Sequence, residues 1–115
     1  MTRPIKSSNI NGKRLTGVEL SDGLARCHAW NYDAIRGGTI SRVFEFSNFR
    51  VAFAFMTQVA FAADKRAHHP EWSNTYARVE VTLTTHDVGG LSIADIEFAL
   101  SIDKIFEVFI PTVRR

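Results

Sequence analysis

The chain has 115 residues, a length that suits one domain and leaves no room for a second of full size. Its hydrophobic (45%) and charged (23%) fractions are close to those of globular proteins, which argues against disorder and fibrous repeats. The 14 basic and 12 acidic side chains give a net charge of +2, too small to indicate nucleic-acid binding. A single cysteine, Cys27, excludes an intrachain disulfide and fits a reducing compartment.

The sequence predicts neither a secretory leader nor a membrane span. Residues 1–8 carry charge, but no apolar run of the kind found in a signal peptide follows them. The longest apolar stretch, residues 49–63, is shorter than the ~20 residues that a transmembrane helix needs. We therefore expect a soluble, cytoplasmic protein that does not enter a membrane.

A polar N-terminal segment precedes the predicted domain. Residues 1–14 combine basic side chains with a Ser-Ser-Asn run, which indicates a flexible arm ahead of a single domain over 15–115. The first element expected in that domain is a short helix over 19–28, with Thr16 or Ser21 as its cap.

Two strands are predicted after the short helix, over 30–36 and 39–46. Between them, Gly37-Gly38 can adopt the positive φ angles of a two-residue hairpin turn. Alternate residues of a strand share a face. One face of the second strand carries Ile40, Arg42, Phe44 and Phe46, and the other carries Ser41, Val43 and Glu45.

A long helix is expected next, capped by Ser47 or Asn48 and ending near Ala67. Its first half, residues 49–56, is apolar nearly all the way round, whereas a surface helix normally has one apolar stripe. A chain of this size covers only part of such a helix, so we expect a partner subunit to cover the rest. The alternative is a central helix that is fully buried within a monomer.

After the long helix the hydrophobic pattern changes to the alternation of a strand. Residues 78–85 predict a strand with one buried and one solvated face, and residues 72–76 form either another short strand or a loop. The run from Ser92 to Asp95 has the pattern of a capping box, and the helix that it opens should end before Pro111. This order of elements predicts an α+β domain with helices on one face of an antiparallel sheet.

Three of the four histidines, His68, His69 and His86, fall around one turn and one strand of the second half. Pro70 disfavours helical geometry at His69, so the long helix should end there and present both imidazoles. Asp64 lies four residues before His68, on the same face of the helix, where a carboxylate can orient the imidazole. Histidines are suited to act as paired acid and base near neutral pH.

Other interpretations of these residues stay open or fit less well. The histidines are alternatively ordinary surface or capping groups, and Trp72 is either the wall of a pocket for a flat heterocycle or a packing residue. The histidine spacing lacks the usual zinc-binding patterns, so no metal is expected. Cys27 lies far from the histidines in sequence, no Gly-x-Ser-x-Gly turn is present, and the Gly-Gly pairs lack the lysine of a phosphate-binding loop.

The second half of the chain also contains a longer spaced series. It comprises Asp64, His68-His69-Pro70, Trp72, Tyr76, Val79, Val81, Leu83, Thr85-His86-Asp87, Gly89-Gly90-Leu91-Ser92 and Asp95. This series resembles the signature of the pterin-4a-carbinolamine dehydratase family, the 4a-hydroxytetrahydrobiopterin dehydratases. Upstream, Trp30 and the phenylalanines of the second strand and the long helix fit it too, so the resemblance covers about residues 18–107.

The resemblance implies a four-stranded antiparallel sheet with about three helices on one face, in a homodimer or homotetramer. Enzymes of the family are hydro-lyases that dehydrate 4a-hydroxytetrahydropterin to quinonoid dihydropterin. This reaction recycles the tetrahydrobiopterin cofactor of aromatic amino acid hydroxylases. The resemblance therefore implies a pterin substrate and a hydroxylase as partner, with no metal and no organic cofactor in the site.

The resemblance also implies roles for individual residues. The catalytic histidines of the family match His68, His69 and His86. Of these, His68 and His86 would share the acid and base roles, and Asp64 would orient His68. Further contacts to the substrate are expected from His69, Trp72, Asp87 and Asp95.

Two alternatives remain within the resemblance. One is an oligomeric dimerisation cofactor for a homeodomain transcription factor, which binds protein and not DNA, because the sequence shows no basic stripe or recognition helix. The other is a dehydratase-like protein of another pterin pathway, such as molybdopterin metabolism. The complete histidine set favours the enzyme.

Overall fold

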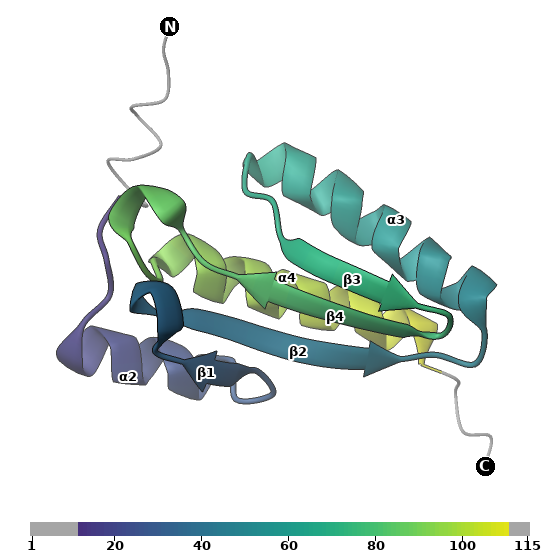
Figure 1. Cartoon of the computed structure of the whole chain (residues 1–115), viewed down its shortest axis with the longest axis horizontal. Helices are drawn as coiled ribbons and strands as arrows, with labels where there is room; N and C mark the ends of the chain where they lie inside the picture. The colour runs from purple at the N-terminus through teal and green to yellow at the C-terminus, as the bar shows by residue number, and fades with distance from the viewer. Residues whose placement is uncertain (1–11, 111–115) are drawn as a thin grey trace, which may run out of the picture.

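A computed structural model describes residues 12–110, which form helices packed on a single sheet (Figure 1). The helices are α2 (Gly17–Arg26), α3 (Phe49–Arg66) and α4 (Ile93–Phe109). The strands are β1 (Asn31–Asp33), β2 (Thr39–Glu45), β3 (Glu71–Thr75) and β4 (Arg78–Leu83), with short 3-10 turns at Ile35–Gly37 and His86–Val88.

Most of the predicted N-terminal arm, residues 1–11, lies outside the described part of the chain. The described residues that follow contact the body of the protein. The Arg14 guanidinium donates a hydrogen bond to the carbonyl oxygen of Gly37 at 3.1 Å. The backbone N–H of Leu15 donates to the carbonyl oxygen of Leu91 at 2.8 Å.

The four strands form one antiparallel sheet in the order β1-β2-β4-β3, and the helices cover one of its faces (Figure 1). The alternation predicted for β4 is confirmed, because Val79, Val81 and Leu83 are buried while the residues between them are partly exposed. Residues 72–76, for which the sequence predicts either a short strand or a loop, belong mostly to β3. The predicted α+β fold is therefore confirmed.

The helices begin and end close to the predicted residues. The Asn48 side chain caps α3 by accepting a hydrogen bond from the Val51 N–H at 2.9 Å. The capping box at the start of α4 is also confirmed: Ser92 Oγ accepts from the Ala94 N–H at 3.2 Å, and Asp95 Oδ2 accepts from the Ser92 N–H at 2.9 Å.

The core lies between the sheet and helices α3 and α4, and aromatic rings fill much of it. The Phe44 ring centroid lies 4.8 Å from that of Phe55 and 4.9 Å from that of Phe106. Arg42 shares the core-facing side of β2 with Phe44, and its guanidinium lies 4.6 Å from the centre of that ring. It also pairs with Asp103 at 2.6 Å, which compensates the partly buried charge.

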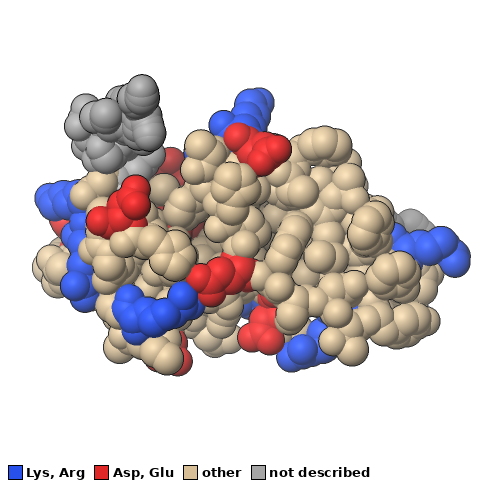
Figure 2. All heavy atoms as spheres, turned by 45° about the horizontal axis from the view of Figure 1, so that its top comes forward, with Lys and Arg blue, Asp and Glu red and all other residues tan. Residues whose placement is uncertain are grey.

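Helix α3 is not buried on all sides by the described chain. It buries one stripe, and the phenylalanines Phe49, Phe53 and Phe61 remain 46%, 56% and 66% exposed. The right-hand half of the face in Figure 2, on the side of α3, is mostly uncharged. The stripe that α3 buries consists of Ala52, Phe55, Val59 and Ala63.

The connection between β1 and β2 is longer than predicted. Pairing between the two strands ends at Asp33 and Thr39, so residues 34–38 form the loop. The prediction of a two-residue turn at Gly37-Gly38 is therefore wrong. The chain forms a 3-10 turn before it enters β2, and the lack of a side chain at Gly37 allows that turn to approach the loop at Gly89.

The close approach at Gly37 yields a stability prediction. A Cβ at Gly37, where φ is 82°, would lie 1.8 Å from the carbonyl oxygen of Gly89. We expect Gly37→Ala to lower the free energy of unfolding by more than the ~1 kcal/mol that a positive φ alone costs, as urea denaturation would measure. Gly17→Ala is the matched control, because Gly17 has a φ of 56° but open space around it. Equal losses in the two variants would contradict the close-approach argument.

Candidate functional site

The histidine pair follows directly on the end of α3. The helix ends because Ala67 takes the left-handed conformation (φ 54°, ψ 39°), and the N–H groups of Ala67 and His68 both donate to the carbonyl oxygen of Ala63. The end of the helix near Ala67 agrees with the prediction. Because the chain turns at Ala67, the next residues do not continue the faces of α3.

A buried carboxylate holds His68. Asp95, in the first turn of α4, is fully buried, and its Oδ1 lies 2.6 Å from His68 Nε2. Its other oxygen accepts hydrogen bonds from the Thr85 hydroxyl at 2.7 Å and from the Ser92 N–H at 2.9 Å. A buried carboxylate needs such donors, and here they also fix its direction. The His68 side chain is 16% exposed, so its orientation is set by Asp95 while part of it reaches the surface.

Asp64 pairs with His69 and not with His68, contrary to the prediction. Asp64 Oδ1 lies 3.0 Å from His69 Nε2, and the two side chains are 82% and 67% exposed. The left-handed turn at Ala67 is the physical reason, because the i, i+4 spacing brings side chains together only on a continuous helix. An exposed pair of this kind contributes little to stability.

His86 lies in the 3-10 turn after β4 and contacts a carboxylate from another strand. Its Nε2 lies 3.4 Å from Oε2 of Glu71, the first residue of β3. Arg36 donates two hydrogen bonds of 2.9 Å to the same carboxylate. These hydrogen bonds hold the pKa of the Glu71 carboxyl below its usual value, partly opposed by burial and reinforced by the charges of Arg36 and His86.

Two series of side-chain contacts connect the segments that carry the histidines. One runs from His68 through Asp95 to Thr85, the residue before His86. The other runs from His86 to Glu71, which follows the histidine pair at the start of β3. The predicted histidines therefore gather at the end of the sheet where β4 ends and β3 begins.

The remaining predicted contacts to a substrate are placed differently. Asp95 is fully buried, and its oxygens face protein donors, so a direct contact with a substrate is not available to it. Trp72 is half-buried, pairs with Val81 in the sheet and packs against the core, as in the packing alternative. Asp87 is exposed beside His86.

Sequence reasoning missed Glu71 and Arg36, and it gave Thr85 no role in the site. Arg36 and Glu71 are 35 residues apart in the chain, and they meet because the β1–β2 loop and the start of β3 lie at the same end of the sheet. A firm assignment of residues 72–76 as a strand would have placed Glu71 at its start, which is the one signal the sequence offered. Thr85 was assigned to the preceding strand, so its contact with α4 could not be anticipated.

The described residues offer no support for nucleophilic or metal chemistry at other positions. Cys27 is 2% exposed, and burial raises the pKa of its thiol, with the charge of Asp103 acting in the same direction. A thiol with a raised pKa holds little of the reactive thiolate at neutral pH. Within residues 12–110, no group of three or more histidine, cysteine, aspartate or glutamate side chains could hold a metal ion.

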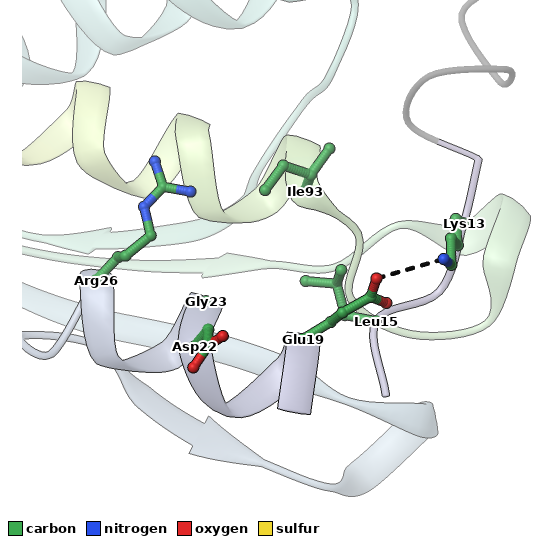
Figure 3. Close-up of a pocket in the computed structure, with 7 residues that line it drawn as sticks. All are labelled: Lys13, Leu15, Glu19, Asp22, Gly23, Arg26 and Ile93. Carbon is green, nitrogen blue, oxygen red and sulfur yellow. Dashed lines mark hydrogen bonds and ion pairs between the residues drawn. The ribbon is translucent and has the colours of Figure 1, made fainter. Parts of the chain in front are cut away.

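The structure also contains a cavity away from the histidines, between α2 and the start of α4 (Figure 3). It has a volume of about 360 Å³, and none of the predicted site residues lines it. Its rim carries an ion pair of 3.4 Å between Lys13 and Glu19. A smaller hollow of about 200 Å³ is lined by His68 together with Arg66, Ala94 and Glu97.

No helix among the described residues is long and apolar enough to cross a bilayer. On the face shown in Figure 2, basic and acidic side chains are scattered among uncharged ones, without a continuous basic stripe. This distribution agrees with the small net charge of the chain.

Solved structures share this fold. A structure from Brucella melitensis, described as a transcriptional coactivator/pterin dehydratase, is 42% identical, has a TM-score of 0.75, and covers 81% of this chain and 98% of its own. A pterin dehydratase-like protein described as a RuBisCO assembly factor of the α-carboxysome is 21% identical, with a TM-score of 0.60 over 70% of this chain and 93% of its own. The fold is thus that of a pterin dehydratase-like protein.

Sequence comparison specifies the family. A relative from Rhizorhabdus wittichii, provisionally named pterin-4-alpha-carbinolamine dehydratase, is 50% identical over 93 residues, which are 81% of this chain and 95% of the relative. One from Sinorhizobium medicae with the same provisional name is 44% identical over 99 residues, 86% of this chain and 93% of the relative. The model of the pterin 4 alpha carbinolamine dehydratase family matches residues 13–105. The chain belongs to this family, as the resemblance predicted.

Proposed function

We propose that the protein dehydrates 4a-hydroxytetrahydropterin to quinonoid dihydropterin and so recycles a cofactor of the tetrahydrobiopterin type. The observation that best supports this proposal is the pairing of His68 with buried Asp95 at the end of the sheet that also carries His86. The reaction removes the 4a-hydroxyl group as water and the proton from N5. It needs one acid and one base, and no electrons are transferred.

The proposed roles follow from the contacts of the histidines. Asp95 orients His68 through Nε2, which leaves Nδ1 for proton exchange with the pterin. His68 and His86 share the acid and base roles: one protonates the departing 4a oxygen, and the other accepts the N5 proton. Exchange with solvent then restores both protonation states. His69 is exposed and contributes to substrate binding, as does Asp87.

A dehydratase assay tests the proposal. The wild-type protein should accelerate the conversion of freshly generated 4a-hydroxytetrahydropterin to quinonoid dihydropterin, followed by ultraviolet absorbance. The double variant His68→Ala/His86→Ala should lose the acceleration, with circular dichroism confirming that it is folded. A folded wild-type protein that does not accelerate the reaction would contradict the proposed function.

We also propose that the active form is a homodimer or homotetramer in the cytoplasm. The exposed phenylalanines of α3 support this, since Phe49, Phe53 and Phe61 form an apolar surface that a second copy would cover. A hydroxylase that produces the 4a-hydroxypterin is the corresponding partner in the reaction sequence.

A second candidate function is protein binding. The same apolar face of α3 and the description of the Brucella melitensis relative as a transcriptional coactivator favour it. A protein of another pterin pathway, such as molybdopterin metabolism, is the remaining alternative. Absence of dehydratase activity in a folded oligomer would favour these candidates over the first.

A further inference from the structure

Arg36 occupies the loop between β1 and β2 in a conformation that non-glycine residues rarely adopt. Its φ and ψ angles are 56° and 31°, in the left-handed region. Contacts of the following backbone hold the loop in place. The carbonyl oxygen of Gly37 accepts a hydrogen bond from Arg14 at 3.1 Å, and that of Gly38 accepts one from the Thr84 hydroxyl at 2.8 Å. The loop therefore has anchors that do not depend on the Arg36 side chain.

The Arg36 side chain reaches across the end of β4 to the start of β3. Its two terminal nitrogens each lie 2.9 Å from one carboxylate oxygen of Glu71, which is bidentate geometry. The sheet register explains how they meet. Ile40 lies opposite Leu83, and Glu71 lies opposite Thr82, so β2 and β3 both begin beside the end of β4.

Glu71 connects this pair to His86. Its Oε2 accepts one of the hydrogen bonds from Arg36 and also lies 3.4 Å from His86 Nε2. Asp87, the next residue in the chain, also carries a charge and is exposed. The side chains of Arg36 and Glu71 are each 45% exposed and that of His86 is 75% exposed, so solvent weakens their electrostatic coupling.

We propose that Arg36 and Glu71 are positioning residues for His86. The Glu71 carboxylate directs the imidazole, and the Arg36 guanidinium both fixes that carboxylate and neutralises its charge. An imidazole beside an uncompensated carboxylate stays protonated to higher pH, whereas one beside an uncompensated guanidinium loses its proton at lower pH. The proposal rests on the proposed function, in which His86 donates or accepts a proton.

Two charge-removing variants should shift the pH dependence in opposite directions. In Arg36→Gln, the pH profile of kcat/KM and the NMR titration of His86 should both move to higher pH, because the carboxylate of Glu71 is then no longer compensated. In Glu71→Gln, both should move to lower pH. The pKa of Glu71 is held low by the hydrogen bonds from Arg36, so the carboxylate of the wild-type protein stays charged throughout the neutral range.

Control variants separate this role from a structural one. Arg36→Lys keeps the positive charge without the bidentate geometry. The midpoints of the kcat/KM profile and of the His86 NMR titration should therefore return to their wild-type values. Arg78→Gln removes the same charge from an exposed pair with Glu80 (3.9 Å), at the opposite end of β4 from His86, and should shift nothing. Both substitutions at residue 36 retain a Cβ, so the strain of its left-handed conformation is the same as in the wild-type protein.

The possible results divide clearly. Opposite shifts in Arg36→Gln and Glu71→Gln, with none in Arg78→Gln, support the proposal. Shifts in the same direction, no shift, or an equal shift in Arg78→Gln would overturn it. The NMR titration keeps this test separate from the proposed function, because an inactive wild-type protein refutes the dehydratase while opposite NMR shifts still establish the coupling to His86.

Discussion

The single variants His68→Ala and His86→Ala should each lower kcat for pterin dehydration by about 10²–10⁴-fold, which is the usual contribution of one general acid or base. Each single variant should lose activity, because departure of the hydroxyl group needs a protonated group and removal of the N5 proton needs an unprotonated one. One histidine cannot supply both at once. Steady-state kinetics over a range of substrate concentrations would measure kcat and KM for each variant.

The fourth histidine provides the control for this experiment. His28 is exposed just after α2, and none of the contacts that link the site involves it. His28→Ala should therefore retain the wild-type kcat. His69→Ala should chiefly raise KM. Removing a residue that binds the substrate equally well in the ground state and in the transition state changes KM and not kcat. Wild-type kcat in both His68→Ala and His86→Ala would exclude the proposed acid and base.

The fold was predictable wherever the signal was local. The capping box at Ser92 and the alternation over 78–83 depend on residues close together in the chain, and both are confirmed. The loop at 34–38 was not predictable from two adjacent glycines, because Gly37 serves a contact with Gly89, which is distant in sequence. Local sequence patterns indicate the conformation that a segment prefers on its own. The conformation of this loop depends instead on its contacts with a distant part of the chain.

The candidate site shows the same division. The histidines were found by their residue type and by the resemblance to a family. Their partners were not: sequence spacing paired Asp64 with the wrong histidine, Asp95 was expected to contact the substrate, and Glu71 was not identified. One left-handed residue, Ala67, redirects the chain and moves Asp64 from His68 to His69. No periodicity argument detects a single change of φ.

Asp95→Asn should lower kcat by about 10²–10⁴-fold, since an amide of the same shape cannot hold His68 in the tautomer and direction that a carboxylate imposes. Three donors converge on the carboxylate of Asp95: His68, Thr85 and Ser92. An amide offers one oxygen and one NH₂ group, so either His68 changes its tautomer to accept from the NH₂ group or one of the donors faces another donor. The variant should therefore also unfold more easily, by about 1–3 kcal/mol in urea denaturation, the cost of a buried polar group left unsatisfied.

The matched variant Asp64→Asn separates the two carboxylates. Asp64 is 82% exposed and contacts only the exposed His69 among the described ion pairs, so its loss should change neither stability nor kcat appreciably. Nitrogen NMR of the imidazoles adds a direct observation, because Asp95→Asn should alter the tautomer of His68 and Asp64→Asn should not. A larger loss of kcat in Asp64→Asn than in Asp95→Asn would show that the carboxylate before the histidine pair supports the chemistry, and that the buried Asp95–His68 contact serves the stability of α4 instead.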